Sequence, residues 1–322
     1  MYFSRRSTRF IALAAVCCTP LWAVEPQNGG MDERSFMLQG EYVGQLDLPT
    51  GKKKLGGQVI ARGNDQFQIV WYDGGLPGNG WNKGDPREGV GKTDGGIITF
   101  RDGEYLGQLK ASAIVVMDAS GVMVGELKKV LRTSPTLGAK PTKDAVVLFD
   151  GTGSDQFEGG RMTNDALLME GATSKRKFQS GTLHLEFRVP FDPLEPARGN
   201  SGCYLQGRYE LQILNSFGRL PHHHECGGIP GVMAPSVNMS YPPGRWQTYD
   251  VKFTAATYKD SKKEKNARIT VRHNGVLIHD DVEIPNATQS SPLAEGPESG
   301  PINLQDHGSP VRYRNIWFVE NE

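Results

Sequence analysis

The sequence predicts an all-β protein in which a small β-domain precedes a sandwich of two packed antiparallel sheets. Three observations support this prediction. Short runs of alternating apolar and polar residues follow one another along most of the chain, as strands with one buried face require. The 322 residues include 40 glycines and 20 prolines, many of which stand as turn signals between the runs. No stretch of useful length has the 3.6-residue period of an amphipathic helix.

The first 23 residues have the pattern of an export signal. Three arginines precede the apolar run Phe10–Cys18, and the small residue Ala23 offers a cleavage point. The run is too short to span a bilayer, and no later stretch reaches the roughly eighteen apolar residues of a transmembrane helix. We therefore expect residues 1–23 to be a signal peptide, and the protein to be periplasmic or secreted without a membrane span.

The net charge argues against nucleic acid as a partner, and the cysteines leave the presence of a disulfide undecided. The formal net charge is zero, so nothing attracts a phosphate backbone and nucleic acid is not an expected partner. The basic run Lys259–Arg268 lies between two strand-like segments and is expected to be a solvated hairpin tip. Once the signal has left, Cys203 and Cys226 are the remaining cysteines. Export would permit a disulfide between them, and their spacing does not decide it.

The first half, residues 24–138, is expected to form the small β-rich domain. Its long glycine-rich loop Gly74–Gly96 carries Trp81, which could stack on a sugar or pack between domains. The segment Arg132–Asp144 has two prolines and few apolar residues, as linkers do. The strand-like runs of this half are Phe36–Leu46, Leu55–Ala61, Gln66–Tyr72, Gly96–Phe100, Ala111–Asp118 and Val122–Leu131.

The second half, residues 139–322, is expected to form the sandwich. Asn274-Gly275 is a strong signal for a two-residue hairpin turn. About eight to twelve strands with one apolar face each favour two packed antiparallel sheets. After Ala145–Gly153, the strand-like runs are Thr182–Val189, Cys203–Leu214, Trp246–Phe253, Ala267–His273, Val276–Ile278 and Val311–Val319.

One predicted strand, Tyr204–Gln212, has an unusually polar outward face. Its alternate positions carry an aromatic hydroxyl, two amides, an arginine and a carboxylate: Tyr204, Gln206, Arg208, Glu210 and Gln212. Three more strands of this half have polar faces, with Glu186, Asp250 and Arg314 among their side chains. If the four strands share one sheet, these groups line a single groove.

The run His222–Glu225 raises the question of a metal site. Adjacent residues in extended chain point apart, and no ligand spacing accompanies these histidines, so no metal and no other cofactor is expected. His223 is instead a candidate substrate contact at the rim of the groove.

Seven segments of the second half stand out in order along the chain: LFDG at Leu148–Gly151, EFR at Glu186–Arg188, GNSGCYLQGRYELQIL at Gly199–Leu214, CGGI at Cys226–Ile229, PPGRWQTYDVKF at Pro242–Phe253, HNGVLIHDDVE at His273–Glu283 and LQDHGSPVRYRNIW at Leu304–Trp317. Together they resemble the 3-keto-disaccharide hydrolase domain family, and the resemblance covers residues 145–319. It implies a concanavalin-like jelly roll and an exported bacterial hydrolase acting on glycosides or disaccharides that carry a ketone at sugar carbon 3. The first half resembles extensions found beside this domain in some exported bacterial proteins.

The implied chemistry needs a base, a stabiliser for the enolate oxygen and an acid for the leaving oxygen. A 3-ketone acidifies the proton on carbon 2, so a base can remove it while the aglycone leaves carbon 1, and water addition completes a net hydrolysis. We expect Glu210 as base, Arg208 as stabiliser and Glu186 or His307 as the second acid. The candidate substrate contacts are Tyr204, Gln206, Gln212, His223, Asp250, Gln305, Asp306 and Arg314.

Two other functions stay open at this point. The same fold serves lectins, so a carbohydrate-binding module without catalysis is possible. A glycosidase acting on unoxidised sugars would need two carboxylates, which Glu186 and Glu210 could supply. Plainer interpretations also stand for single residues: a surface ion pair for Arg208 and Glu210, and a buried structural acceptor for Asp250.

Overall fold

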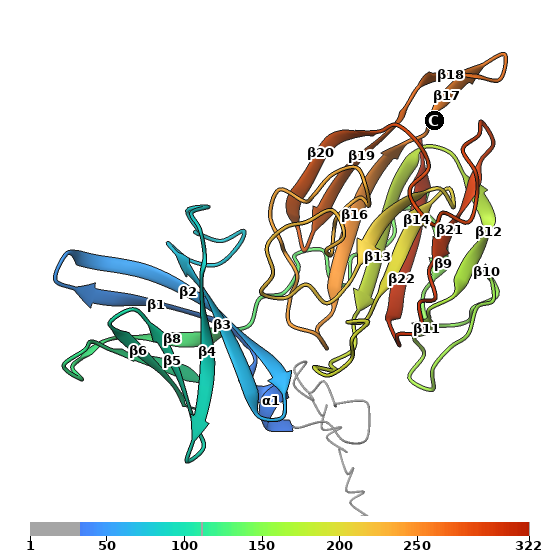
Figure 1. The fold of residues 1–322 in the computed structure, drawn as a ribbon. Coiled ribbons are helices and arrows are strands. Elements are labelled where there is room, and N and C mark those ends of the chain that lie inside the picture. The colour runs from blue at the N-terminus through green and yellow to red at the C-terminus, as the bar shows by residue number, and fades with distance from the viewer. Residues whose placement is uncertain (1–32, 111, 322) are drawn as a thin grey trace, which may run out of the picture.

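The protein consists of an eight-stranded barrel beside a two-sheet sandwich (Figure 1), so the predicted all-β fold is confirmed. The structure, a computed structural model, describes residues 33–110 and 112–321. The predicted signal peptide lies outside these residues. In the part of the chain that is described, no helix has the length and apolar character needed to cross a membrane.

The barrel closes by antiparallel pairing of each strand with the next and of the last with the first. The short helix α1 (Glu33–Leu38) lies at one end, where Leu38 joins the apolar core of the barrel. The strands are β1 (Gly40–Leu48), β2 (Gly51–Gly63), β3 (Gln66–Asp73), β4 (Arg87–Asp94), β5 (Ile97–Asp102), β6 (Tyr105–Lys110), β7 (Ala113–Met117) and β8 (Met123–Val130).

The sequence pattern missed β4 and β6 for a steric reason. Gly89 and Gly91 of β4 occupy inward positions, and a Cβ at either would meet side chains of the barrel core. Gly107 does the same in β6, where a Cβ would lie 3.1 Å from Ile114. Bulky neighbours fill the space that these glycines leave, so the strands show no apolar alternation.

The sandwich has a five-stranded and a seven-stranded antiparallel sheet. In the five-stranded sheet the order is β10 (Phe157–Glu158), β12 (Ala172–Phe178), β21 (Gly300–Leu304), β14 (Ser201–Leu205) and β15 (Tyr209–Ile213). In the other the order is β11 (Leu168–Met169), β22 (Arg312–Glu320), β13 (Gly181–Arg188), β16 (Gln247–Thr254), β19 (Ala267–His273) and β20 (Val276–Ile284), with β9 (Val146–Phe149) also pairing with β22.

Two turns of the sandwich agree with the sequence analysis. Asn274 and Gly275, both with positive φ, join β19 to β20 as predicted. The basic run forms the hairpin of β17 (Thr257–Lys259) and β18 (Lys262–Lys265), which projects at the top of Figure 1. Cys203 and Cys226 are free and buried, and burial raises the pKa of each thiol, that of Cys203 to about 12.

The prediction that Tyr204–Gln212 is one strand is wrong. Gln206 and Gly207 have φ of 54° and 62°, and the Arg208 N–H donates to the Leu205 carbonyl at 3.0 Å. These residues therefore form a tight turn, and β14 and β15 are the two arms of a hairpin. The pair Gln-Gly is a weaker turn signal than Asn-Gly, so the alternation of the flanking residues concealed the turn.

The prediction that the four polar strands share one sheet is also wrong. β15 belongs to the five-stranded sheet, whereas β13, β16 and β22 belong to the seven-stranded sheet. The apolar faces of both sheets meet in one core. The polar side chains therefore lie on opposite outer faces of the sandwich, and no single groove contains them all.

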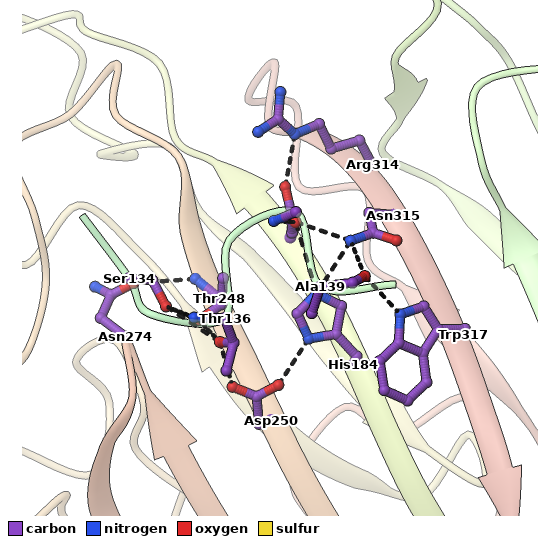
Figure 2. A network of polar contacts seen from close by, with 12 residues as sticks. Ser134, Thr136, Ala139, His184, Thr248, Asp250, Asn274, Arg314, Asn315 and Trp317 are labelled. Carbon is purple, nitrogen blue, oxygen red and sulfur yellow. Dashed lines mark hydrogen bonds and ion pairs between the residues drawn. The ribbon is translucent and has the colours of Figure 1, made fainter. Parts of the chain in front are cut away.

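The segment between barrel and sandwich is held in place at several points. Arg132 forms an ion pair with the buried Glu41, and residues 134–139 lie across the outer face of the seven-stranded sheet (Figure 2). Elsewhere Trp81 packs on a small cluster that Phe217 of the sandwich shares with barrel residues. Independent folding of the two halves stays a prediction, which limited proteolysis between Arg132 and Lys143 would test.

Candidate functional site

Glu210 lies in the middle of β15 with its side chain on the outer face of the five-stranded sheet. Its chain neighbours Tyr209 and Leu211 point into the core. On one side it pairs with Tyr204 across the hairpin. On the other side its backbone N–H donates to the Thr288 hydroxyl at 2.9 Å. The side chain is 5% exposed, so the carboxyl group is both fixed and largely desolvated.

This desolvation changes the acidity of Glu210. Burial raises its pKa to about 7, although a hydrogen bond from Tyr204 acts in the opposite direction. A carboxyl group with a pKa near neutrality can both accept and donate a proton under ordinary conditions. Glu210 therefore has the acidity of a general acid–base group.

The expected pairing of Arg208 with Glu210 is wrong. Arg208 lies in the hairpin turn, where its Nε donates to the Ala294 carbonyl at 2.7 Å and its Nη1 to the Glu298 carbonyl at 2.9 Å. It anchors the 286–298 segment, and the pKa of Glu210 rises where an adjacent guanidinium would have lowered it. Gln206 also turns away and donates to the Phe178 carbonyl at 3.1 Å.

Three of the predicted substrate contacts do share the face of Glu210. The Tyr204 hydroxyl accepts a hydrogen bond from Gln305 Nε2 at 3.3 Å, in addition to its bond with the carboxyl group. Gln305 follows β21, and its N–H donates to the Gly202 carbonyl at 2.9 Å. Gln212 lies two residues beyond Glu210 on the same face of β15. These side chains form a cluster of hydrogen-bonding groups around one protonatable carboxyl group.

Gly202 is a member of this site that the sequence analysis did not single out. A Cβ built on Gly202 would lie 2.3 Å from Glu210 Oε1, so the carboxyl group rests directly over this backbone. Only glycine leaves the necessary space. The available signal was a glycine directly before a predicted strand, where a missing side chain can allow the close approach of another group.

Glu186 lies in a different environment, on the outer face of the seven-stranded sheet. It is fully buried and accepts hydrogen bonds from Arg314, Asn315 and the Gly138 N–H. Burial alone would raise its pKa, but these bonds and one from His184 lower it to about 2. A carboxylate this strongly stabilised is a poor proton acceptor. The contacts of Glu186 are therefore those of a buried anion that supports the structure.

The predicted contacts Asp250 and Arg314 belong to the same network as Glu186 (Figure 2). Asp250 accepts a hydrogen bond from the Thr136 hydroxyl at 2.6 Å and lies 2.7 Å from His184 Nδ1. Burial opposes protonation of His184, but its bonds to Asp250 and Glu186 raise its pKa above the ordinary value. The network thus joins the chain segment 134–139 to the sheet beneath it.

The remaining predicted site residues lie in loops. Asp306 Oδ1 accepts the Gly308 N–H at 2.9 Å, which fixes a turn after β21, and His307 beside it is exposed. His223 is half-buried in a loop, where its Nδ1 accepts the Gly231 N–H at 3.0 Å. This loop approaches the site because the Gln212 N–H donates to the Gly228 carbonyl at 2.9 Å.

The described residues offer no evident metal centre. Within 33–110 and 112–321, no group of three or more His, Cys, Asp or Glu side chains is arranged to hold an ion. The adjacent histidines His222, His223 and His224 contact one another through their rings.

The sandwich matches a known family. Residues 144–319 match the family model described as the 3-keto-alpha-glucoside-1,2-lyase-like domain, so the resemblance stated from the sequence is confirmed. No curated protein matches the chain.

Solved structures from Parabacteroides distasonis are similar to part of this chain. One, named a "putative glycosyl hydrolase", is 30% identical to this chain, covers 56% of it and 84% of its own length, and has a TM-score of 0.51. A second of the same name is 16% identical over 57% of this chain and 99% of its own, with a TM-score of 0.43.

Proposed function

Since the chain belongs to the family of 3-keto-alpha-glucoside-1,2-lyase-like domains, we propose that it cleaves the glycosidic bond of sugars that carry a ketone at carbon 3. The observation that carries this proposal is Glu210, a fixed and largely buried carboxyl group with a pKa of about 7. A carboxyl group of this acidity is well suited to removing a proton from carbon, because it is a stronger base than an ordinary carboxylate and is still partly ionised at neutral pH.

The proposed reaction begins at carbon 2 of the sugar. The Glu210 carboxylate takes the carbon 2 proton, which the neighbouring ketone has made acidic. The electron pair of that C–H bond forms a double bond between carbons 1 and 2. The bond from carbon 1 to the aglycone oxygen breaks, and the oxygen leaves with its electron pair and gains a proton. Water then adds its oxygen to carbon 1 and its proton to carbon 2, so the sum of the steps is hydrolysis.

The residues around Glu210 have distinct parts in this proposal. Tyr204 orients the carboxyl group through its hydrogen bond. Gln212 and Gln305 offer amide groups for the sugar hydroxyls. Gln212 lies on the same face of β15 as Glu210, and Gln305 lies at the edge of that face beside Tyr204. His307, exposed beside Gln305, is the candidate acid for the leaving oxygen. We also propose that the protein works outside the cytoplasm, since residues 1–23 have the pattern of an export signal.

A direct assay tests the proposal. The purified protein is incubated with a 3-keto-disaccharide and, separately, with the unoxidised parent disaccharide, and released monosaccharide is measured. Release from the keto substrate alone is expected. Equal release from both would refute the requirement for a ketone and favour an ordinary glycosidase. Binding of either sugar without release would favour a lectin-like module.

A further inference from the structure

The N-terminal barrel contains a cavity that the proposed chemistry does not use. Its volume is about 540 Å³, and its walls include Leu46, Leu55, Trp71, Tyr105 and Val116. The cavity lies at the end of the barrel where turns join β1 to β2 and β5 to β6. The helix α1 lies at the opposite end. Eight-stranded barrels have an interior wide enough to hold one small ligand, and ligand pockets are commonly about 300–1,000 Å³.

Trp71 provides an unsatisfied hydrogen-bond donor at this cavity. It is 3% exposed, and its Nε1 has no hydrogen-bond partner in the structure. Its ring points into the barrel, because Cβ atoms built on Gly89 and Gly107 would lie 3.7 Å and 3.4 Å from indole atoms. A buried indole N–H normally finds a partner, and leaving it without one is costly. An acceptor from a bound molecule would satisfy it.

The mouth of the cavity is charged although its walls are mainly apolar. Arg87 joins Asp73 and Asp102 at 3.0 Å and 2.8 Å, and Lys53 lies 2.8 Å from Asp73. Burial opposes the ionisation of Asp73, but hydrogen bonds from Lys53 and Arg87 lower the pKa of this carboxyl group. The ion pairs at the mouth can therefore contact a polar end of a ligand while its apolar body lies deeper.

We propose that the barrel binds one small, mainly apolar molecule that contains a ring and carries a hydrogen-bond acceptor. The ring would pack between Trp71, Leu55 and Val116, and the acceptor would receive the Trp71 Nε1–H. The two aromatic side chains in the wall favour a flat ring over a flexible chain. This binding site is separate from the face that carries Glu210 and does not depend on the function proposed for it.

The experiment uses the whole protein and the dye 1-anilinonaphthalene-8-sulfonate, which joins apolar rings to an acidic acceptor group. Dye binding is followed by its own emission under direct excitation, so that changes of tryptophan content do not interfere. Saturable one-to-one binding is expected. Trp71→Phe keeps an aromatic ring but removes the donor, so it should weaken binding by about five- to tenfold, the usual effect of one hydrogen bond.

A matched pair of variants locates the dye. Leu48→Trp adds bulk at the half-buried mouth of the cavity and should reduce affinity more than tenfold. Val90→Trp adds the same bulk on the outer surface of β4, where Val90 is 77% exposed, and should leave affinity unchanged. Glu210→Gln should also bind the dye normally. If Leu48→Trp and Trp71→Phe, both folded by circular dichroism, bind as wild type does, the proposal is wrong.

Discussion

Substitution of Glu210 by Gln should stabilise the protein while it abolishes most of its activity. The folded protein raises the pKa of this carboxyl group from 4.5 to about 7. At about 1.4 kcal/mol for each pH unit, this difference corresponds to about 3 kcal/mol. Below pH 4.5 the group is protonated in both states and the full stability is present. Between pH 4.5 and about 7 the unfolded state loses this proton while the folded state keeps it, so that stability is lost progressively until the folded-state carboxyl group ionises as well.

Glutamine keeps the shape of glutamate but never ionises, so the two proteins should differ only above pH 4.5. We expect Glu210→Gln to be more stable than wild type by up to about 3 kcal/mol at pH 8, and equal to it near pH 4. Urea unfolding at several pH values measures this free energy. An unchanged difference between pH 4 and pH 8 would show that the carboxyl group is not desolvated, and the reasoning would fail.

The same ionisation should control catalysis in the opposite direction. A base must be ionised to accept a proton, so kcat/KM on the keto substrate should rise with pH to a plateau above about 7. Glu210→Gln should lower kcat at least about a hundredfold, the usual scale for a lost acid–base group. If it turns over normally while His307→Ala does not, the base is His307.

Three further predictions concern neighbouring groups. Tyr204→Phe removes the hydrogen bond that lowers the pKa of Glu210, so the kcat/KM profile should move to higher pH; an unmoved profile would contradict the bond. Gly202→Ala places a Cβ 2.3 Å from Glu210 Oε1 and should lower kcat about tenfold or more with the fold intact, whereas Gly153→Ala, whose Cβ would have no atom nearer than 4.0 Å, should be neutral in the same assay. Glu186→Gln should lower the free energy of unfolding by about 3 kcal/mol, as loss of one partner from a buried ion pair does. Its stabilising effect should be present above pH 4.5 and lost as the pH falls towards 2, and the folded variant should retain near wild-type turnover.

The fold could be predicted from the sequence because alternation records which face of each strand is buried. Leu183, Leu185 and Phe187 do point into the core, with His184 and Glu186 on the other side. Alternation does not record which sheet a strand joins, because pairing depends on contacts distant in the chain. The polar faces of β13 and β15 were therefore identified correctly, but their assignment to one groove was wrong.

The environment of each carboxyl group could be predicted even less well. Arg208 and Glu210 are two residues apart, and in one continuous strand they would be neighbours on the same face. A turn with positive φ at Gln206 and Gly207 leaves Arg208 outside strand β15, and Arg208 binds carbonyl groups of a distant loop. Because the pKa of Glu210 depends on the position of Arg208, its direction of change could not be read from the sequence.

The two outer faces of the sandwich each bury a glutamate, and the pKa of the two carboxyl groups changes in opposite directions. Glu186 is buried by the chain's own segment 134–139, which supplies the Gly138 N–H, and β22 adds Arg314 and Asn315. Because the protein itself supplies the hydrogen bonds that stabilise this charge, a ligand that approaches Glu186 adds no further stabilisation. Glu210 is nearly as buried, yet its bond from Tyr204 does not offset the desolvation. A carboxyl group that is costly to ionise gains most from a substrate that gives it a proton. For this reason we propose the face of the five-stranded sheet, and not the face of the seven-stranded sheet, as the place of catalysis.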